Sequence, residues 1–188
     1  MVFIFGLFAL LVALASGSVV VDGRQQVDPV VGAEDETVVA SYNVRTASQW
    51  ANRDGGDQAN QRTWGTRKMA VAKSVLISGA SVVGSQEGLA WQLDELLGLL
   101  GPTWRRAGGG RFGDGGDEDE LAAVLYDAKR VELVGTGDFW LSEQPEVRGS
   151  KGWGASLPRV ATWARFFQPS SGPSVGPAEP TAAAQAAE

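Results

Sequence analysis

The sequence predicts an α/β protein, in which strands alternate with helices. Segments rich in β-branched and apolar residues alternate with two segments whose apolar residues recur at helical spacing. All of these segments lie within residues 37–167, between an acidic stretch and a tail of Pro, Ser, Gly and Ala. The chain has 188 residues, of which 44% are hydrophobic and 20% are charged, and this length and composition are typical of one globular domain.

The first expected strand is TVVASYNV, which begins at Thr37 and leads into a loop rich in Gly, Asp and Asn over residues 52–60. We expect a helix over residues 62–78, because four apolar residues fall roughly on one face there: Trp64, Val71, Val75 and Leu76. Residues 80–86 then have the composition of a second, buried strand.

The clearest helix in the sequence is GLAWQLDELLGLLG, residues 88–101. Its leucines recur at the spacing of one helical face: Leu89, Leu93, Leu96, Leu97 and Leu100. Gly101 and Pro102 follow directly, and this pair is a typical stop signal. The segment therefore predicts an amphipathic helix that covers the sheet.

The remaining elements are short. A strand is expected around Trp104, followed by a glycine-rich turn, and residues 121–126 and 131–134 are interpreted as a strand pair. Residues 159–166 are the last strand candidate. From residue 168 the chain consists of Pro, Ser, Gly and Ala, with little to bury, and we expect residues 168–188 to be disordered.

The composition excludes several kinds of site. The chain has no cysteine, which rules out disulfides and thiolate metal sites, and no histidine, the commonest general base and metal ligand. Any chemistry would have to use carboxylates, amides, hydroxyls, Arg and Lys. The net charge of -6 argues against broad electrostatic binding to nucleic acid or anionic lipid, although a local basic cleft is compatible with it.

Residues 1–21 form an apolar segment before the first charged residue, Asp22. Ala13-Leu14-Ala15 followed by Ser16 has the small-residue spacing of a signal-peptidase site, which predicts a cleaved signal peptide and secretion. The segment is also long enough for an uncleaved membrane anchor; a start codon assigned too far upstream is the third alternative. Residues 22–36 are polar and acidic and are interpreted as a linker.

Two polar residues lie where expected strands end. Glu87 follows the strand over residues 80–86, and Asn43 lies at the end of the first strand. If the two strands are parallel neighbours, both side chains meet at one edge of the sheet, where open α/β sheets hold their sites. A carboxylate there could bind a hard cation such as Mg²⁺ together with water and phosphate oxygens. The alternative is that Glu87 caps the next helix and Asn43 is a turn residue.

Three other features have simpler interpretations. The seven tryptophans could stack on bases or sugars, but we interpret most of them as core or loop-packing residues. Gly108–Gly110 lacks the Lys-Ser/Thr pair and the following helix of a phosphate-binding loop. Residues 114–120 are acidic but lack the ligand spacing of a calcium-binding loop, so we interpret them as a solvated turn.

A series of motifs runs along residues 37–167: SYNVR, TWGTRK, VVGSQEG, GRFGDGGDEDELAAVLY, GTGDFWLSEQPEVRGSKGWG and PRVATWARF. Their order resembles the endonuclease/exonuclease/phosphatase superfamily, and most of all its branch with a Phe-Trp-Leu-Ser-Glu-x-Pro segment. The resemblance implies the N-terminal half of a four-layer α/β/β/α sandwich. It also implies Mg²⁺-dependent hydrolysis of phosphate esters.

The resemblance assigns roles to four residues. Glu87 matches the Mg²⁺-binding glutamate, and Asn43 matches an asparagine near the metal and the scissile phosphate. Glu120 matches the glutamate that orients a catalytic histidine. Arg111 matches a loop at the rim of the active site. The implied catalytic residues are therefore Asn43 and Glu120, with Glu87 as the metal ligand.

The chain departs from the family after Phe166, where we expect the second sheet to begin. The family's later histidines are absent, and no asparagine follows Asn60, so an Asp-x-Asn pair is missing. Asp138, in a Gly-Asp-Phe sequence, is interpreted as structural. Without a histidine partner, Glu120 would be a surface carboxylate, and the first sheet would expose an apolar face.

These observations predict part of a phosphodiesterase or nuclease. The parent domain would hydrolyse a phosphate ester of DNA, RNA, a phospholipid or a small molecule, with Mg²⁺ bound weakly or not at all in this chain. We expect the chain alone to be inactive, because the general acid and base groups are missing. The alternative is a catalytically inactive binding domain that uses the uncovered face of its sheet. A membrane partner is expected only with an uncleaved anchor.

Overall fold

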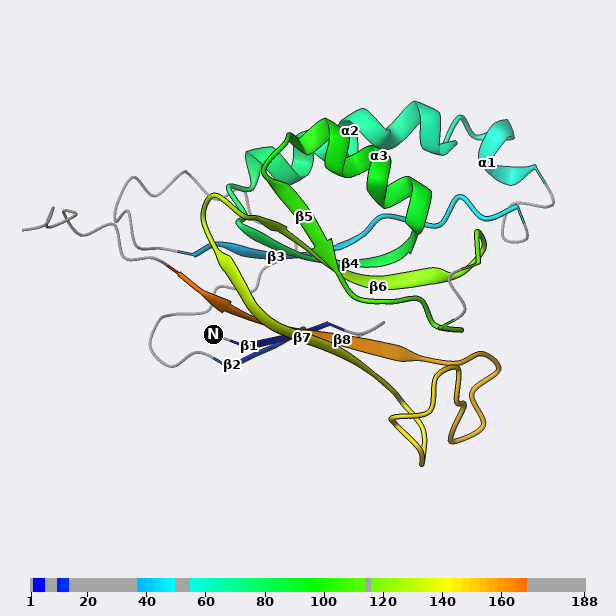
Figure 1. Ribbon diagram of the computed structural model, residues 1–188. Coiled ribbons are helices and arrows are strands. Elements are labelled where there is room, and N and C mark those ends of the chain that lie inside the picture. Colours follow the sequence, from blue (N-terminus) through cyan, green and yellow to red (C-terminus); the bar gives the residue numbers. More distant parts are fainter. Residues whose placement is uncertain (1, 6–9, 14–36, 50–54, 114–115, 169–188) are drawn as a thin grey trace, which may run out of the picture.

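The computed structural model describes residues 2–5, 10–13, 37–49, 55–113 and 116–168. Two four-stranded sheets pack face to face, and helices cover the outer face of one of them (Figure 1). The order of layers is therefore helices, first sheet, second sheet. The expected α/β class is confirmed.

The first sheet has the strand order β3-β4-β6-β5. Its strands are β3 (Val39–Asn43), β4 (Val82–Leu89), β5 (Trp104–Ala107) and β6 (Glu120–Asp127). β3 and β4 run parallel, whereas β6 is antiparallel to both β4 and β5. The two central strands, β4 and β6, are buried along nearly their whole length. The middle of β6 is a continuous apolar run, whereas β4 also buries the polar residues Ser85 and Gln86.

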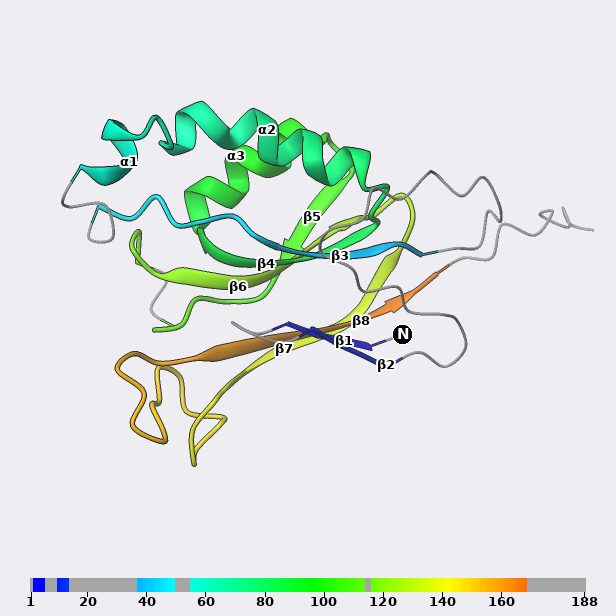
Figure 2. The same ribbon diagram turned by 180° about the vertical axis from the view of Figure 1, so that it is seen from behind.

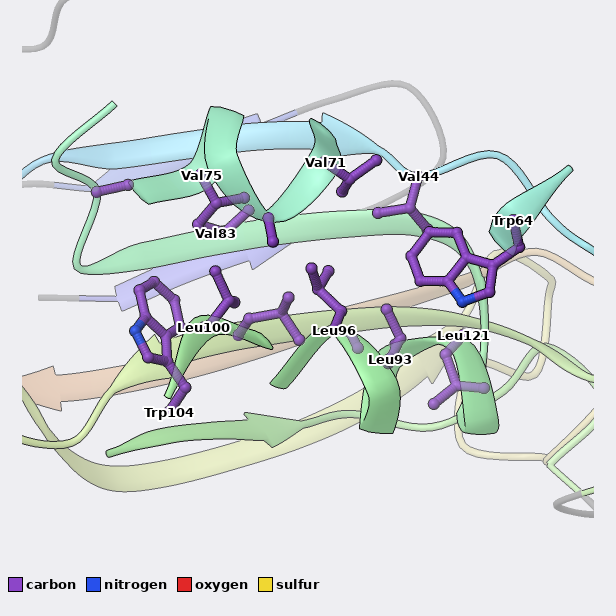
Figure 3. Close-up of a cluster of buried hydrophobic side chains, with 14 residues drawn as sticks. Val44, Trp64, Val71, Val75, Val83, Leu93, Leu96, Leu100, Trp104 and Leu121 are labelled. Atoms are coloured by element: carbon purple, nitrogen blue, oxygen red, sulfur yellow. The ribbon is translucent and has the colours of Figure 1, made fainter. Parts of the chain in front are cut away.

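The helices are α1 (Gly56–Ala59), α2 (Trp64–Ile77) and α3 (Ala90–Leu100). α2 and α3 pack against the first sheet and enclose its main core, as Figure 3 shows. The core consists of Val44, Trp64, Val71, Ala72, Val75, Ala80, Val83, Leu93, Leu96, Leu100, Trp104, Leu121, Ala123 and Leu125. The leucine spacing thus predicted the buried face of α3 correctly.

A close approach explains the glycine between β4 and α3. A Cβ atom on Gly88 would lie 2.6 Å from Cδ2 of Leu93, which is fully buried one helical turn later. Only glycine therefore lets the chain turn directly from the strand into the helix.

The second sheet has the order β2-β1-β8-β7 and is antiparallel throughout. Its strands are β1 (Val2–Phe5), β2 (Leu10–Ala13), β7 (Glu132–Trp140) and β8 (Val160–Phe167). It lies against the face of the first sheet opposite the helices (Figure 2), and two smaller clusters join the two sheets. They consist of Val82, Val124, Val131, Ala164 and Phe166, and of Ala122, Trp140 and Val160.

The expected pairing of residues 121–126 with 131–134 is wrong. A tight turn at Asp127, closed by the N–H groups of Arg130 and Val131, separates β6 from β7. β6 stays in the first sheet, whereas β7 crosses to the second sheet and pairs with β8. The second sheet therefore begins before Phe166.

The expectation that the first sheet exposes an apolar face is also wrong. β7 and β8 pack against that face through two clusters of buried residues. The alternative of a binding domain that uses this uncovered face is therefore wrong as well.

The expected secreted or membrane-anchored localisation through residues 1–21 is contradicted. Val2–Phe5 and Leu10–Ala13 are strands of the second sheet, where β1 pairs antiparallel with β8. The apolar, β-branched sequence thus serves sheet formation. In the part of the chain that the structure describes, no helix is long and apolar enough to cross a membrane. The expected linker (22–36) and all of the expected tail but residue 168 lie outside the described residues.

Candidate functional site

Asn43 and Glu87 meet at the edge of the first sheet, as the sequence predicted. β3 and β4 are parallel neighbours, with Asn43 in register with Gln86. The Nδ2 atom of Asn43 donates a hydrogen bond to Oε1 of Glu87 over 2.8 Å. The amide therefore fixes the carboxylate, and Glu87 is not a helix cap, because α3 begins three residues later.

A β-bulge in β4 places the Glu87 side chain. Ser85 lies opposite Ala123 and Gly88 opposite Leu121, so both Gln86 and Glu87 face the single residue Ala122. Glu87 has a φ of 62°, the left-handed region that non-glycine residues rarely adopt. Bulges of this kind redirect side chains and occur often beside functional sites. The bulge is the local reason why Glu87 lies at the end of the sheet.

Gln92 holds the loop that follows Asn43. Its side chain is fully buried, accepts hydrogen bonds from the N–H groups of Ala47 (2.8 Å) and Leu89 (3.3 Å), and donates to the carbonyl of Arg45 (3.2 Å). The N–H of Arg45 in turn donates to Oδ1 of Asn43 over 2.7 Å. This second bond leaves the Asn43 amide nitrogen directed at Glu87.

The sequence reasoning missed Gln92, although a signal for it existed. Gln92 lies three residues after Leu89 and beside Leu93, on the apolar face of α3, where a polar residue needs a buried partner. Arg67 of α2 supports the same loop, because its guanidinium donates to the carbonyls of Val44 and Arg45.

Arg111 and Glu120 form an ion pair on the other side of the bulge, with side chains only 10% and 17% exposed. The backbone brings them together, because the N–H of Arg111 donates to the carbonyl of Glu120 over 3.0 Å. Burial lowers the pKa of the Arg111 guanidinium, and the neighbouring cation Arg159 lowers it further, against the opposing effects of Asp119 and Glu87. The expectation that Glu120 is a surface carboxylate is wrong, because its partner is an arginine.

Asp119 shapes the loop that carries Arg111. It is 2% exposed, and its carboxylate accepts hydrogen bonds from the N–H groups of Phe112 (3.0 Å) and Gly113 (3.2 Å). A Cβ on Gly110 would lie 2.1 Å from Oδ2 of Asp119, so this glycine serves close packing. Gly110 of the glycine run and Asp119 of the acidic cluster therefore have structural roles here.

A small pocket joins these side chains at the end of the sandwich. Its walls come from β4, the Arg111 loop, β6 and the start of β8, and its lining residues are Gln86, Glu87, Arg111, Glu120, Leu121, Ala122, Pro158, Arg159 and Val160. The cavity volume is about 20 Å³, which is enough for one group the size of a water molecule. The pocket brings together three of the four predicted site residues, and Asn43 contacts it through Glu87.

The donor set fits a weakly held hard cation. Within the described residues, no three Asp, Glu, His or Cys side chains cluster as metal ligands. Glu87 offers one carboxylate, of which Oε1 is bonded to Asn43. Mg²⁺ is commonly held by one or two carboxylates together with water and substrate phosphates, and Glu87 at the pocket meets this minimum.

The comparisons with known proteins point in one direction. No family model and no curated protein matches the chain. Among solved structures, it is similar to an endonuclease/exonuclease/phosphatase family protein from Bacteroides thetaiotaomicron, with 39% identity and a TM-score of 0.61 over 69% of this chain and 43% of the other. It is also similar to a mannosyl-6-phosphatase from that organism (38%, TM-score 0.63, 71% and 46%). A third similar structure is an endonuclease/exonuclease/phosphatase from Bacteroides vulgatus (31%, 0.59, 68% and 45%). The chain spans less than half the length of each.

Proposed function

The chain belongs to the endonuclease/exonuclease/phosphatase superfamily, and we propose that it supplies the Glu87 side of a Mg²⁺-dependent site that hydrolyses phosphate esters. The observation that carries the proposal is the Asn43–Glu87 hydrogen bond, at the carboxyl ends of two parallel strands and beside a pocket with two arginines. Such an edge is where α/β sheets place their sites.

Each side chain has a defined task in this proposal. Glu87 would hold Mg²⁺, which, when bound, offsets charge on the phosphate and helps to activate water. Asn43 fixes the Glu87 carboxylate through its amide nitrogen. The Arg111–Glu120 ion pair keeps a buried guanidinium next to the pocket without a large net charge.

The substrate class follows from the chemistry of the pocket and from one neighbour. The similarity to a mannosyl-6-phosphatase supports a sugar phosphate as the substrate of the parent domain. A nucleic acid is the competing substrate, and the net charge of -6 disfavours it, because binding to the backbone phosphates of nucleic acid relies on clustered cations.

The test measures Mg²⁺ binding to the full chain by isothermal titration calorimetry. We expect saturable binding in the wild type and its loss in Glu87→Gln, which keeps the shape of the side chain but removes its charge. Glu132→Gln, an exposed carboxylate on β7, is the matched control and should bind Mg²⁺ as the wild type does. Equal binding by Glu87→Gln and the wild type would show that the metal assignment is wrong.

A hydrolysis assay tests the activity of the chain by itself. We expect no appreciable cleavage of bis-p-nitrophenyl phosphate, a sugar phosphate or single-stranded DNA or RNA at millimolar Mg²⁺. The reason is that the chain has no histidine, the commonest general base, and general acid-base help typically contributes about 10²- to 10⁴-fold. Cleavage by the wild type that is lost in Glu87→Gln would contradict this expectation and show that the chain is catalytic alone.

A further inference from the structure

Arg159 is held in the wall of the pocket by its backbone. It lies directly before β8, between the buried residues Pro158 and Val160. Its carbonyl accepts a hydrogen bond from the N–H of Leu141 over 2.7 Å, and Val160 pairs with Trp140 across the second sheet. The root of the side chain is therefore fixed, while the side chain itself lines the pocket and is half-buried.

The guanidinium of Arg159 has no acidic partner among the described residues, in contrast to Arg111. The charged residues that line the pocket are Glu87, Arg111, Glu120 and Arg159. Arg111 is paired with Glu120, and Glu87 is bonded to Asn43. Arg159 makes no ion pair and no side-chain hydrogen bond with the residues the structure describes. The pocket thus holds one guanidinium whose charge is not balanced by a direct contact.

The charge of Arg159 acts on Arg111 across the pocket, where Glu87 and Asp119 act in the opposite direction. Arg159 is close enough to Arg111 for its charge to lower the Arg111 pKa, and burial weakens the screening of that repulsion by water. The half-buried guanidinium of Arg159, on the pocket wall and without an acidic partner among the described residues, is therefore available to bind an anionic ligand.

We infer that Arg159 binds a non-bridging oxygen of a terminal phosphate, so that the site selects phosphate monoesters over diesters. This inference rests on the proposed function and narrows its substrate class. The cavity admits one water-sized group, which is the size of one phosphate oxygen. A guanidinium offers a fork of N–H donors that matches phosphate oxygens. A monoester also carries about −1.5 to −2 charges and three such oxygens, whereas a diester carries one charge and two oxygens.

Arg165 provides a matched control on the same strand. It is exposed and lies opposite Gly135 in the second sheet, away from the pocket. Replacing either arginine by glutamine removes one positive charge from β8 or its flank. Only the change at Arg159 removes a guanidinium from the pocket wall, so a difference between the two variants cannot come from net charge alone.

The experiment measures binding of phenyl phosphate and methyl phenyl phosphate to the full chain, without metal, by ³¹P NMR titration. Because the monoester carries the larger negative charge and one more non-bridging oxygen, we expect the wild type to bind it at least roughly tenfold more tightly than the diester. Arg159→Gln should lose this preference, and Arg165→Gln should keep it. Arg159→Lys, which keeps the charge without the fork, should retain only part of it, and it replaces Arg159→Gln if that variant does not fold.

Three outcomes would overturn the inference. The first is that Arg159→Gln prefers phenyl phosphate over methyl phenyl phosphate as strongly as the wild type does. The second is that the wild type binds the two probes equally, and the third is that it binds neither. Because these titrations contain no metal, their failure is separate from failure of the proposed function, which is judged by Mg²⁺ binding to Glu87→Gln. If Glu87→Gln loses Mg²⁺ binding but Arg159→Gln keeps the monoester preference, the proposed function stands and the inference about Arg159 is refuted.

Discussion

The two sheets differ in how completely they are covered, and the site lies where they meet. The first sheet has α2 and α3 on one face and the second sheet on the other, and β4 is buried along nearly its whole length (Figure 1). In the second sheet, β7 alternates between exposed and half-buried residues, and no helix of the described residues covers its outer face. The fully covered sheet supplies Asn43, Glu87 and Glu120, while the other supplies Arg159 at its rim.

This difference shows which part of the molecule fixes the site. Among the residues whose burial the structure describes, the core between the helices and the first sheet contains 14 residues, and the clusters between the sheets contain five and three. Burial of apolar surface is the main favourable contribution to folding, and among these residues the helix-covered region buries the most. The bulge at Glu87, with its unfavourable φ, lies in a strand that is buried along nearly its whole length.

The largest expected effect is from Leu96→Ala in the main core. Leu96 is fully buried between α3 and the first sheet, and its truncation should lower the free energy of unfolding by about 2–5 kcal/mol. Urea denaturation measures this change. Val134→Ala, at a residue of β7 that is 44% exposed, is the control and should stay within about 0.5 kcal/mol of the wild type. A Leu96→Ala effect as small as the control would mean that the helices do not stabilise the first sheet.

A pair of neighbouring residues in β8 tests the clusters between the sheets. Phe166 is 3% exposed, faces the first sheet and packs against Tyr126 at 5.1 Å between ring centroids, whereas Phe167 is 55% exposed. We expect Phe166→Ala to cost about 3 kcal/mol, the lower end of the range for a buried phenylalanine, because its cluster is small. Phe167→Ala should cost less than about 0.5 kcal/mol. Equal losses in thermal unfolding would show that the second sheet does not pack on the first through this face.

The smallest expected effect concerns a charged contact beside the helix layer. Asp57 of α1 accepts a hydrogen bond from Nη2 of Arg45 over 2.7 Å, and this bond, with the nearby charges of Arg62 and Arg67, holds the pKa of the Asp57 carboxyl below its usual value. A pKa lowered by folding stabilises the native state above the unfolded pKa of about 3.9, and this stabilisation is lost as the pH falls through the folded pKa.

Asp57→Asn should therefore cost about 1.5 kcal/mol at neutral pH, as expected for loss of a charge-assisted hydrogen bond. The difference between the variant and the wild type should shrink as the pH is lowered below 3.9, which urea denaturation at a series of pH values can follow. Asp94→Asn, whose side chain is 59% exposed in its contact with Arg106, is the control and should show a much smaller dependence. A constant difference at every pH would contradict the ionic origin of the Asp57 effect.

The sequence predicted α2, α3 and most strands well, because each is specified by the spacing of nearby residues, whereas the short helix α1 lies in the expected loop over residues 52–60. The leucines over residues 88–101 predicted the buried face of α3, and Glu87 and Asn43 were expected at one edge. The pairing of β6 with β7 was wrong, since a short turn between two strands indicates proximity in sequence and does not identify the sheet that each strand joins. The N-terminal apolar run was misinterpreted for a similar reason, because a strand of a sandwich core and a leader segment share the same apolar composition.

The sequence by itself determined the local features of this protein: where helices begin and end, which of their faces are apolar, and which chemical groups are missing. The tertiary structure alone decided that Arg111 neutralises Glu120, that a bulge rotates Glu87 toward the pocket, and that Arg159 joins a site 72 residues away from Glu87. Local patterns encode secondary structure because backbone hydrogen bonds and side-chain spacing act over a few residues. The pocket depends instead on how two sheets pack, and that contact between distant segments has no periodic signature in the sequence.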